Sequence, residues 1–358
     1  MLESTHAPMS LHPNHPVSQD PAIANGGGSN SPQGVRIGRG IIQSALERLI
    51  TEGNPQAGAQ RLARNASAHG IDLDLIWGVL GDSTRDQPAV RQVCMVVPGA
   101  GGTGMCFVSN PVLNGKKAPE LGDEATQIDE IGASVLAAIQ GLPTVAPDRV
   151  RIAQMLFEPK QAWTHRVCQR AGMICVGTLD YLRLDYGLIE RWPVSDQSWP
   201  EGITVRPIAD LSMRLPTDDG SLLAMVLEAS YEGTLDCPEL CGMRSMVDVI
   251  ASHESTGVFD ASRWWLMFRG NDPVGCCLLS HCPANESVEL VYLGLSPAVQ
   301  GQGLGVRLLT HALESLRIND AVREVTCAVD RRNIPASKVY LRLGFKRFDA
   351  RVGYVCPL

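Results

Sequence analysis

Glu289-Leu-Val-Tyr-Leu-Gly-Leu-Ser-Pro-Ala-Val-Gln-Gly-Gln-Gly-Leu-Gly305 predicts a strand, a tight glycine loop and the start of a helix. Residues 288–295 alternate and are mostly apolar, as in a buried strand, and Pro297 ends that pattern. From Leu304 onward the apolar residues recur at helical spacing. Glycines at 301, 303 and 305 let backbone N–H groups approach an anion at the positive end of the helix. The stretch therefore predicts a phosphate-binding loop.

The spacing of these glycines separates the loop from two common nucleotide-binding motifs. No Gly-Lys-Ser/Thr follows it, so it is not a P-loop. A dinucleotide fingerprint needs glycine or alanine at position 306, where Val306 stands, and an acidic residue closing a second strand about 20 residues on. The pattern present is Gln-x-x-Gly-x-Gly, formed by Gln300, Gly303 and Gly305.

This pattern resembles the pyrophosphate-binding signature of the GNAT acetyltransferase superfamily, whose members bind acetyl-CoA. A second part of the resemblance lies about 30 residues downstream, where a strand-like segment precedes Asn333, a short helix with Tyr340, and a closing Gly344-Phe345. Upstream, the sequence predicts a first strand, a first helix and a hairpin at residues 203–207, 221–230, 264–269 and 274–280. The resemblance covers residues 203–358.

The resemblance implies how the coenzyme is held. Backbone N–H groups from Gln302 to Val306 are expected to bind its diphosphate, and main-chain groups of Leu293 and Leu295 its pantetheine arm, as an added strand. The alternative without a ligand is an ordinary strand-to-helix turn. The full set of expected cofactor-binding residues is Leu293, Gly294, Leu295, Gln300, Gly301, Gln302, Gly303, Leu304, Gly305, Val306 and Asn333.

Two residues are candidates for proton transfer. Tyr340 is the expected proton donor, because a phenol pKa of about 10 is close to the thiol value of about 8.5. Its alternative is a core aromatic, since it shares an apolar helix face with Ala336, Val339 and Leu343. Glu289 lies where several family members place a water-relaying base, and its alternative is an exposed charge at a strand end. Strict alternation places Tyr292 on the opposite face of the sheet from Glu289.

Other residues have two compatible or competing interpretations. Asn333 is expected to bond the pantetheine or to cap the following helix. By resemblance, residues 228–239 line the acceptor side, where their four acids, with Tyr231, would attract a cationic amine. Solvated loop acids, with Asp236 as a helix cap, are the alternative. Of the adjacent Trp264 and Trp265, one is expected in the core and the other beside a ligand or in the core as well.

The first half predicts a degenerate copy of the same architecture. Residues 40–187 contain helical and strand-like stretches in a similar order, including strands at 174–178 and 181–184. After Ser109 no Gln-x-x-Gly-x-Gly loop follows, and Cys168 stands at the position matching Tyr340. The segment 99–104 satisfies Gly-x-Gly-x-x-Gly, but strand residues follow it, so we expect a hairpin turn instead of a dinucleotide site.

Composition narrows the classes of partner and compartment. The net charge is −7 with no lysine or arginine run, which argues against nucleic acid or an anionic membrane as a partner. Eleven cysteines in 358 residues show neither a disulfide framework nor zinc-site spacing, which favours a reducing cytoplasm and no metal. Residues 1–35, rich in Pro, Ser, Asn, Gly and His, predict a disordered tail.

These observations predict an α+β protein with two GNAT-like domains, each a mixed, mostly antiparallel twisted sheet flanked by helices. The expected boundaries are a tail at 1–35, a degenerate domain at 36–190 and a catalytic domain at 200–358, a tandem arrangement distantly similar to mycothiol-synthase-like proteins. The resemblance implies an N-acetyltransferase that uses acetyl-CoA and an amine of a small molecule, protein or peptide. A non-catalytic acyl-CoA sensor and a protein-docking module stay as alternatives; the acceptor and the oligomeric state are open.

Overall fold

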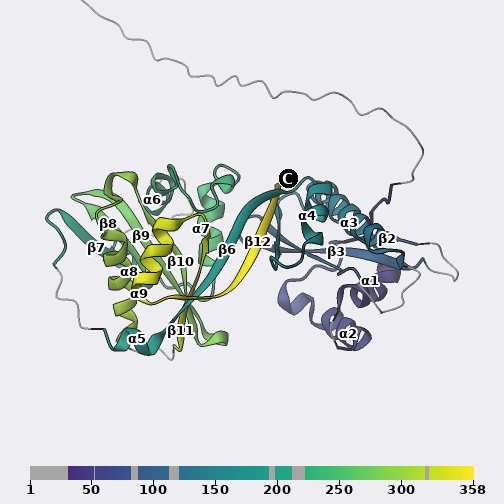
Figure 1. The fold of residues 1–358 in the computed structure, drawn as a ribbon, viewed down its shortest axis with the longest axis horizontal. Coiled ribbons are helices and arrows are strands. Elements are labelled where there is room, and N and C mark those ends of the chain that lie inside the picture. The colour runs from purple at the N-terminus through teal and green to yellow at the C-terminus, as the bar shows by residue number, and fades with distance from the viewer. Residues whose placement is uncertain are drawn as a thin grey trace, which may run out of the picture. The chain divides into compact units, whose positions relative to one another are not determined.

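Residues Pro32–Leu358 form one compact unit built on a single sheet (Figure 1). The structure, a computed structural model, describes residues 31–51, 53–81, 88–112, 121–192, 198–211, 222–318 and 322–358. Its twelve strands lie in the order β1-β2-β3-β4-β5-β12-β6-β11-β10-β9-β8-β7. All pairs are antiparallel except β4·β5 and β10·β11. The predicted α+β class with a mixed, mostly antiparallel sheet is confirmed.

The predicted helices and strands occur in the predicted order, and β1 and α5 are additional. Those of the first half are β1 (Val35–Arg36), α1 (Ile42–Leu49), α2 (Pro55–Asn65), β2 (Ile76–Leu80), β3 (Val90–Gly99), β4 (Thr103–Val108), α3 (Glu124–Val145), β5 (Ile152–Phe157), α4 (Trp163–Arg170), β6 (Ile174–Asp185) and α5 (Tyr186–Glu190). Those of the second half are β7 (Ile203–Pro207), α6 (Leu222–Tyr231), α7 (Met246–Glu254), β8 (Trp264–Arg269), β9 (Asp272–Cys282), β10 (Ser287–Leu295), α8 (Leu304–Glu314), β11 (Glu324–Asp330), α9 (Ile334–Leu343) and β12 (Lys346–Pro357).

Three local predictions are settled by these bounds. The predicted strands at 174–178 and 181–184 are one strand, β6, which continues past Gly177 at a φ of +115°. The predicted tail ends earlier than residue 35, because Val35 pairs with Gly78 of β2, whereas residues 1–30 lie outside the described ranges. The hairpin turn at 99–104 is confirmed, because Gly99 pairs with Thr103 across it.

The two halves exchange strands within the sheet. The last strand, β12, pairs with β5 of the first half along Val352–Pro357. Strand β6 of the first half pairs with β11 of the second half from Glu324 to Asp330. Figure 1 shows β6 and β12 running side by side between the two helix-covered parts. The division at residues 190–200 stays a prediction, and the sheet of each half is completed by a strand of the other.

The second half buries apolar side chains on both faces of its sheet. One cluster joins Leu279, Leu290 and Tyr340 with the buried face of α8. The cluster on the opposite face joins Leu278 and Trp264 with the buried residues of α6 and α7. Within the described ranges, no helix is both long enough and apolar enough to cross a membrane.

Candidate active site

Strands β10 and β11 separate in the middle of the second half. Their parallel pairing comprises Ser287 with Glu324, Val288 with Val325, and Glu289 with Thr326. It stops there, although β10 continues to Leu295 and β11 to Asp330. Beyond Glu289, the edge of β10 that faces β11 is therefore free of strand pairing, and its backbone groups can accept an extended ligand as an added strand.

A β-bulge at the same place changes which residues share a face. On β9, Leu279 pairs with Leu290, but the next residue, Leu278, pairs with Tyr292, so Val291 is the extra residue. Tyr292 therefore faces the same side as Glu289, and the prediction that they face opposite sides is wrong. Alternation fails because the bulge inserts one residue, which reverses the side-chain parity of everything beyond it.

The contacts of Tyr292 agree with this assignment. Its ring lies edge-on to Tyr231 of α6, with 5.8 Å between ring centroids, and stacks on His253 of α7 at 5.6 Å. Its hydroxyl shares a hydrogen bond of 2.8 Å with Ser230 Oγ. Burial lowers the pKa of His253 to about 4, so its imidazole is neutral near pH 7. Tyr292 thus ties β10 to α6 and α7.

The predicted glycine loop has the backbone of an anion cradle. Gly301 and Gly303 adopt φ values of +72° and +74°, in the left-handed region that favours glycine. Helix α8 begins at Leu304, and its N-cap Gly303 provides no side-chain hydrogen bond. No side chain caps the first-turn N–H groups, which are therefore available to an anion. Gly305 differs, because a Cβ there would meet Leu295 at an ordinary 3.5 Å.

Side chains around the loop fix its shape. The Gln300 amide donates to the Leu295 carbonyl at 3.0 Å, so this glutamine ties the loop to the end of β10. Gln302 donates to the Ala298 carbonyl at 3.1 Å and accepts from Arg269 at 3.0 Å. Arg269, at the end of β8, is a cation beside the loop that sequence reasoning missed. The only signal for it is the register of the predicted hairpin, which brings that end of β8 to the end of β10.

Tyr340 is a core residue, only 6% exposed, and its ring lies 5.6 Å from that of Phe345. Burial raises its pKa well above the usual value, so the phenol keeps its proton. The core interpretation is therefore correct, and it is compatible with the donor role, which stays a prediction. Asn333 accepts the Ala336 N–H at 3.1 Å and caps α9, so its capping role is confirmed.

Glu289 is half-buried at the point where β10 and β11 separate. Burial raises its pKa above the ordinary glutamate value. Its charge in turn contributes to raising the pKa of Cys327 on β11 and of Tyr181 on β6, after burial. Sequence reasoning did not connect Tyr181 with Glu289, because that tyrosine belongs to the strand supplied by the first half.

The acids of residues 228–239 are partly engaged. The Asp236 carboxylate accepts the Asp330 N–H at 2.7 Å, so it joins the loop to β11, and its expected role as a helix cap is wrong. Glu239 forms an ion pair with Arg332 at 2.7 Å. Of the two tryptophans, Trp264 is fully buried, and the half-buried Trp265 packs edge-on to His311.

Comparisons with known proteins bear on this half of the chain. Residues 229–345 match the acetyltransferase (GNAT) family. A mycothiol acetyltransferase of Salinispora tropica is 31% identical over 207 residues, which is 55% of this chain and 62% of that relative. A mycothiol acetyltransferase of Rhodococcus erythropolis is 32% identical over 168 residues, or 44% of this chain and 52% of that relative. The chain thus covers less than two thirds of the length of these relatives.

Solved structures of proteins named as N-acetyltransferases or GNAT proteins also align with the chain. A GCN5-related N-acetyltransferase from Sphaerobacter thermophilus aligns over 92% of this chain and 96% of that chain, with a TM-score of 0.48 and 19% identity. A tandem GNAT protein from the clavulanic acid biosynthesis pathway aligns over 79% and 82%, with a TM-score of 0.44 and 14% identity. The family match spans the bulged strand, the glycine loop and the helix of Tyr340, so this segment of the chain is similar to the acetyltransferase (GNAT) family.

Proposed function

We propose that the protein transfers an acetyl group from acetyl-CoA to a primary amine, by direct attack of the amine in a ternary complex. One observation carries the proposal. The start of α8, which no side chain caps, lies next to the end of β10, whose edge towards β11 is unpaired. The first suits a diphosphate, and the second suits the amide groups of a pantetheine arm. The match of residues 229–345 to the GNAT family supports the same coenzyme.

Each part of the site has an assigned task. The N–H groups from Gln302 to Val306 would bind the diphosphate, and Leu293–Leu295 the pantetheine. The Leu295 carbonyl already accepts from Gln300, so we assign pantetheine binding there mainly to the remaining backbone groups of this strand end. Acetyl-CoA would supply an activated acyl group as a thioester, whose carbonyl carbon the amine nitrogen attacks.

Proton transfers complete the reaction. Glu289, with its raised pKa, would accept the proton that the amine must lose, directly or through a water molecule. The C–N bond forms, the C–S bond breaks, and Tyr340 would donate its proton to the departing sulfur. Burial raises the pKa of Tyr340, which keeps the phenol protonated before the step but makes it a weaker acid than a free phenol, so its pKa is no longer matched to that of the departing thiol.

We place the acceptor amine beside Glu289, on the face of the sheet that Glu289 shares with Tyr292. Two relatives carry the name mycothiol acetyltransferase, so mycothiol-type acceptors belong in the first panel. Because Glu239 forms an ion pair with Arg332, fewer acids attract a cationic acceptor than the sequence alone indicates. Neutral and anionic amines therefore belong in the panel beside cationic ones.

Calorimetry with acetyl-CoA and a thiol-release assay with an amine panel test the proposal. We expect Tyr340→Phe to lower kcat about a hundredfold while leaving acetyl-CoA affinity unchanged, because only the donated proton is lost. The matched control is Tyr186→Phe, which removes a buried hydroxyl that donates to the Leu316 carbonyl at 2.9 Å, away from the loop.

Three outcomes decide the question. Binding with turnover, and loss of turnover in Tyr340→Phe alone, supports the proposal. Equal turnover in both variants would remove Tyr340 from the mechanism. Acetyl-CoA binding without thiol release for any amine would favour a non-catalytic acyl-CoA sensor.

A further inference from the structure

Residues 232–254, the loop after α6 together with α7, reach β10 through His253, which stacks on Tyr292. Under the proposed function they would form one wall of the acceptor pocket, and we name this segment the acceptor wall. The loop contains only one short 3-10 helix, Pro238–Leu240, before α7 begins at Met246. A loop with so little regular structure needs contacts from outside to hold one conformation. The first half of the chain contacts α7 directly, and through the Val176 carbonyl it also holds Arg332, the second-half residue that binds the loop.

The first contact is an ion pair to α7. Arg151, the residue before β5, directs two guanidinium nitrogens at the Asp248 carboxylate: Nε donates to Oδ2 at 3.1 Å and Nη2 donates to Oδ1. Asp248 has a side chain only 12% exposed. A two-point arginine–carboxylate pair of this kind fixes orientation as well as distance. It therefore anchors the first turn of α7 to the first half.

The glycine turn of the first half lies against the same helix. Gly101, at a φ of +67°, comes so close to α7 that an added Cβ would lie 2.0 Å from the Asp248 carbonyl oxygen and 3.0 Å from Ser252 Cβ. Only glycine permits this approach. The Gly-x-Gly-x-x-Gly segment at 99–104 is thus a hairpin turn that packs against α7.

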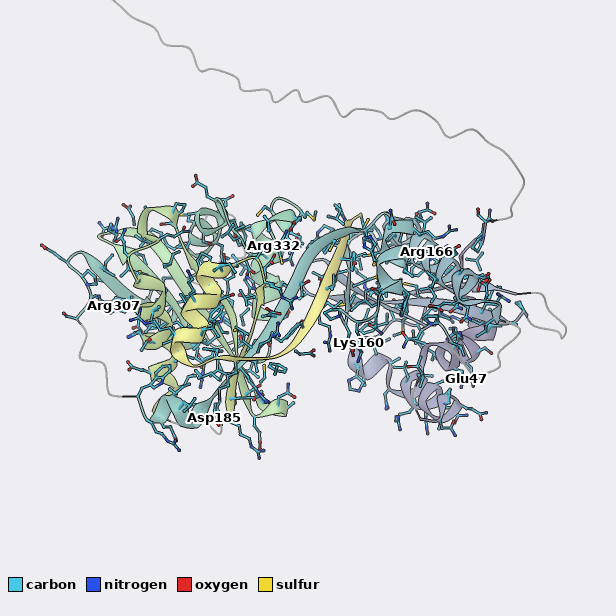
Figure 2. The ribbon with its side chains drawn as sticks, in the orientation of Figure 1. Glu47, Lys160, Arg166, Asp185, Arg307 and Arg332 are labelled. Atoms are coloured by element: carbon cyan, nitrogen blue, oxygen red, sulfur yellow. The ribbon has the colours of Figure 1, made fainter. Side chains whose placement is uncertain are left out.

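The second contact holds the loop itself. Arg332 chelates the Glu239 carboxylate at 2.7 and 2.8 Å, and donates to the carbonyl of Val176 on β6 at 2.8 Å. The same guanidinium binds the fully buried Asp330, which also accepts the Cys237 N–H at 3.1 Å. Figure 2 labels Arg332 in the second half, beside β6. The loop is thereby fixed to β11 and to the strand supplied by the first half.

We propose that the first half positions the acceptor wall and so sets the affinity for the acceptor. Arg151 acts from the first half, and Arg332 of the second half acts while β6 of the first half holds it. The proposal rests on the proposed function, because the wall borders the pocket only if that pocket takes the acceptor. Acetyl-CoA affinity is expected to be independent of both residues, since the glycine loop and the free edge of β10 belong to other elements.

The test compares Arg151→Gln with Arg149→Gln in the full chain. Arg149 also forms an ion pair, with Asp72 at 2.6 Å, but entirely within the first half, so it is a matched control. We expect Arg151→Gln to speed amide hydrogen exchange in residues 245–254 and to raise the KM for the panel amine with fastest turnover about tenfold. The Kd for acetyl-CoA should stay within about twofold, and Arg151→Lys should restore part of the KM.

The second contact needs a mild variant, because removing Arg332 leaves Asp330 buried without its cation and risks unfolding. Glu239→Gln weakens the same link and keeps that pair, and we expect faster exchange in residues 232–245 with a raised acceptor KM.

Equal exchange and equal KM in Arg151→Gln and Arg149→Gln would overturn the proposal. A loosened wall with unchanged acceptor KM would also overturn it, because the contact would then be structural only. If no amine is acetylated, the proposed function fails; the exchange comparison still shows whether the first half holds the wall.

Discussion

The two halves place a helix after the same arrangement of strands, yet only one helix is open to an anion. In the first half, β4 and β5 pair in parallel at three positions, from Thr103 with Ile152 to Met105 with Gln154. In the second half, β10 and β11 do the same at three positions. Helix α3 is capped by Asp123, whose carboxylate accepts the Thr126 N–H at 2.7 Å. Helix α8 has Gly303 at that place and no side-chain cap.

Under the proposed function, the strand arrangement that the two halves share is not enough to make a coenzyme site, and the start of the helix decides. A carboxylate at the cap already satisfies an N–H group that a phosphate would bind, and it repels the phosphate. The strand also differs: the pairing of β3 with β4 is continuous, whereas β9·β10 has the bulge that turns Tyr292. Met105 occupies the pairing position that Glu289 has in the second half. Residues 113–120, which precede α3, lie outside the described ranges.

The largest effect is expected when the start of α8 is given the same cap as α3, an aspartate. We expect Gly303→Asp to weaken acetyl-CoA binding about a thousandfold, because it places a carboxylate where the diphosphate is proposed to bind. Part of the loss comes from the left-handed backbone, which costs a residue with a side chain about 1–2 kcal/mol. Calorimetry with acetyl-CoA measures the total effect.

The variant Gly303→Asn, whose side chain has the same shape as that of Gly303→Asp, separates the effect of charge from that of backbone strain. Asparagine tolerates the left-handed region at least as well as aspartate and has no negative charge. We expect it to lose only about tenfold in affinity. Equal losses in the two variants would show that the charge at the cap is irrelevant to coenzyme binding, and the comparison with α3 would fail.

Glu289 is the second difference, and its effect should depend on pH. We expect Glu289→Gln to lower kcat/KM about tenfold near pH 7 and to abolish the acidic limb of the pH profile.

Burial raises the pKa of Glu289 in the folded state, so its contribution to stability is present below the unfolded value of about 4.3 and is lost as pH rises through the folded value. Glu289→Gln should therefore be at least as stable as the wild type at pH 7, with the difference vanishing in acid.

Glu324→Gln is the matched control, since Glu324 lies at the start of the neighbouring strand β11, two residues before Thr326, which pairs with Glu289. Thermal unfolding from pH 4 to pH 8 measures the change in stability. The dependence of kcat/KM on pH over the same range measures the acidic limb. An acidic limb that persists in Glu289→Gln would assign the base to another group.

Local spacing predicted most elements and the glycine loop, because both depend on residues close together in the chain. Gly301 and Gly303 have the backbone that the motif predicts. The errors arise where distant residues decide. The bulge at Val291 depends on the register with β9, the engagement of Asp236 on a contact with Asp330, and the neighbourhood of Tyr181 and Glu289 on the strand exchange. None of these leaves a local pattern in the sequence.

The smallest expected effect concerns the closed helix of the first half. Asp123→Ala removes the cap of α3, and we expect Tm to fall by about 2 °C at pH 7. We expect no second acetyl-CoA site, since the glycine loop and the bulge are still absent from the first half.

The Thr126 N–H lowers the pKa of Asp123, so the stabilising contribution of Asp123 exists above the unfolded pKa and is lost as pH falls through the folded one. The Tm difference should vanish in strong acid. Asn54→Ala, which removes the neutral cap of α2, should show a difference that does not change with pH. A second coenzyme bound per Asp123→Ala chain would show that the cap alone closes the first half.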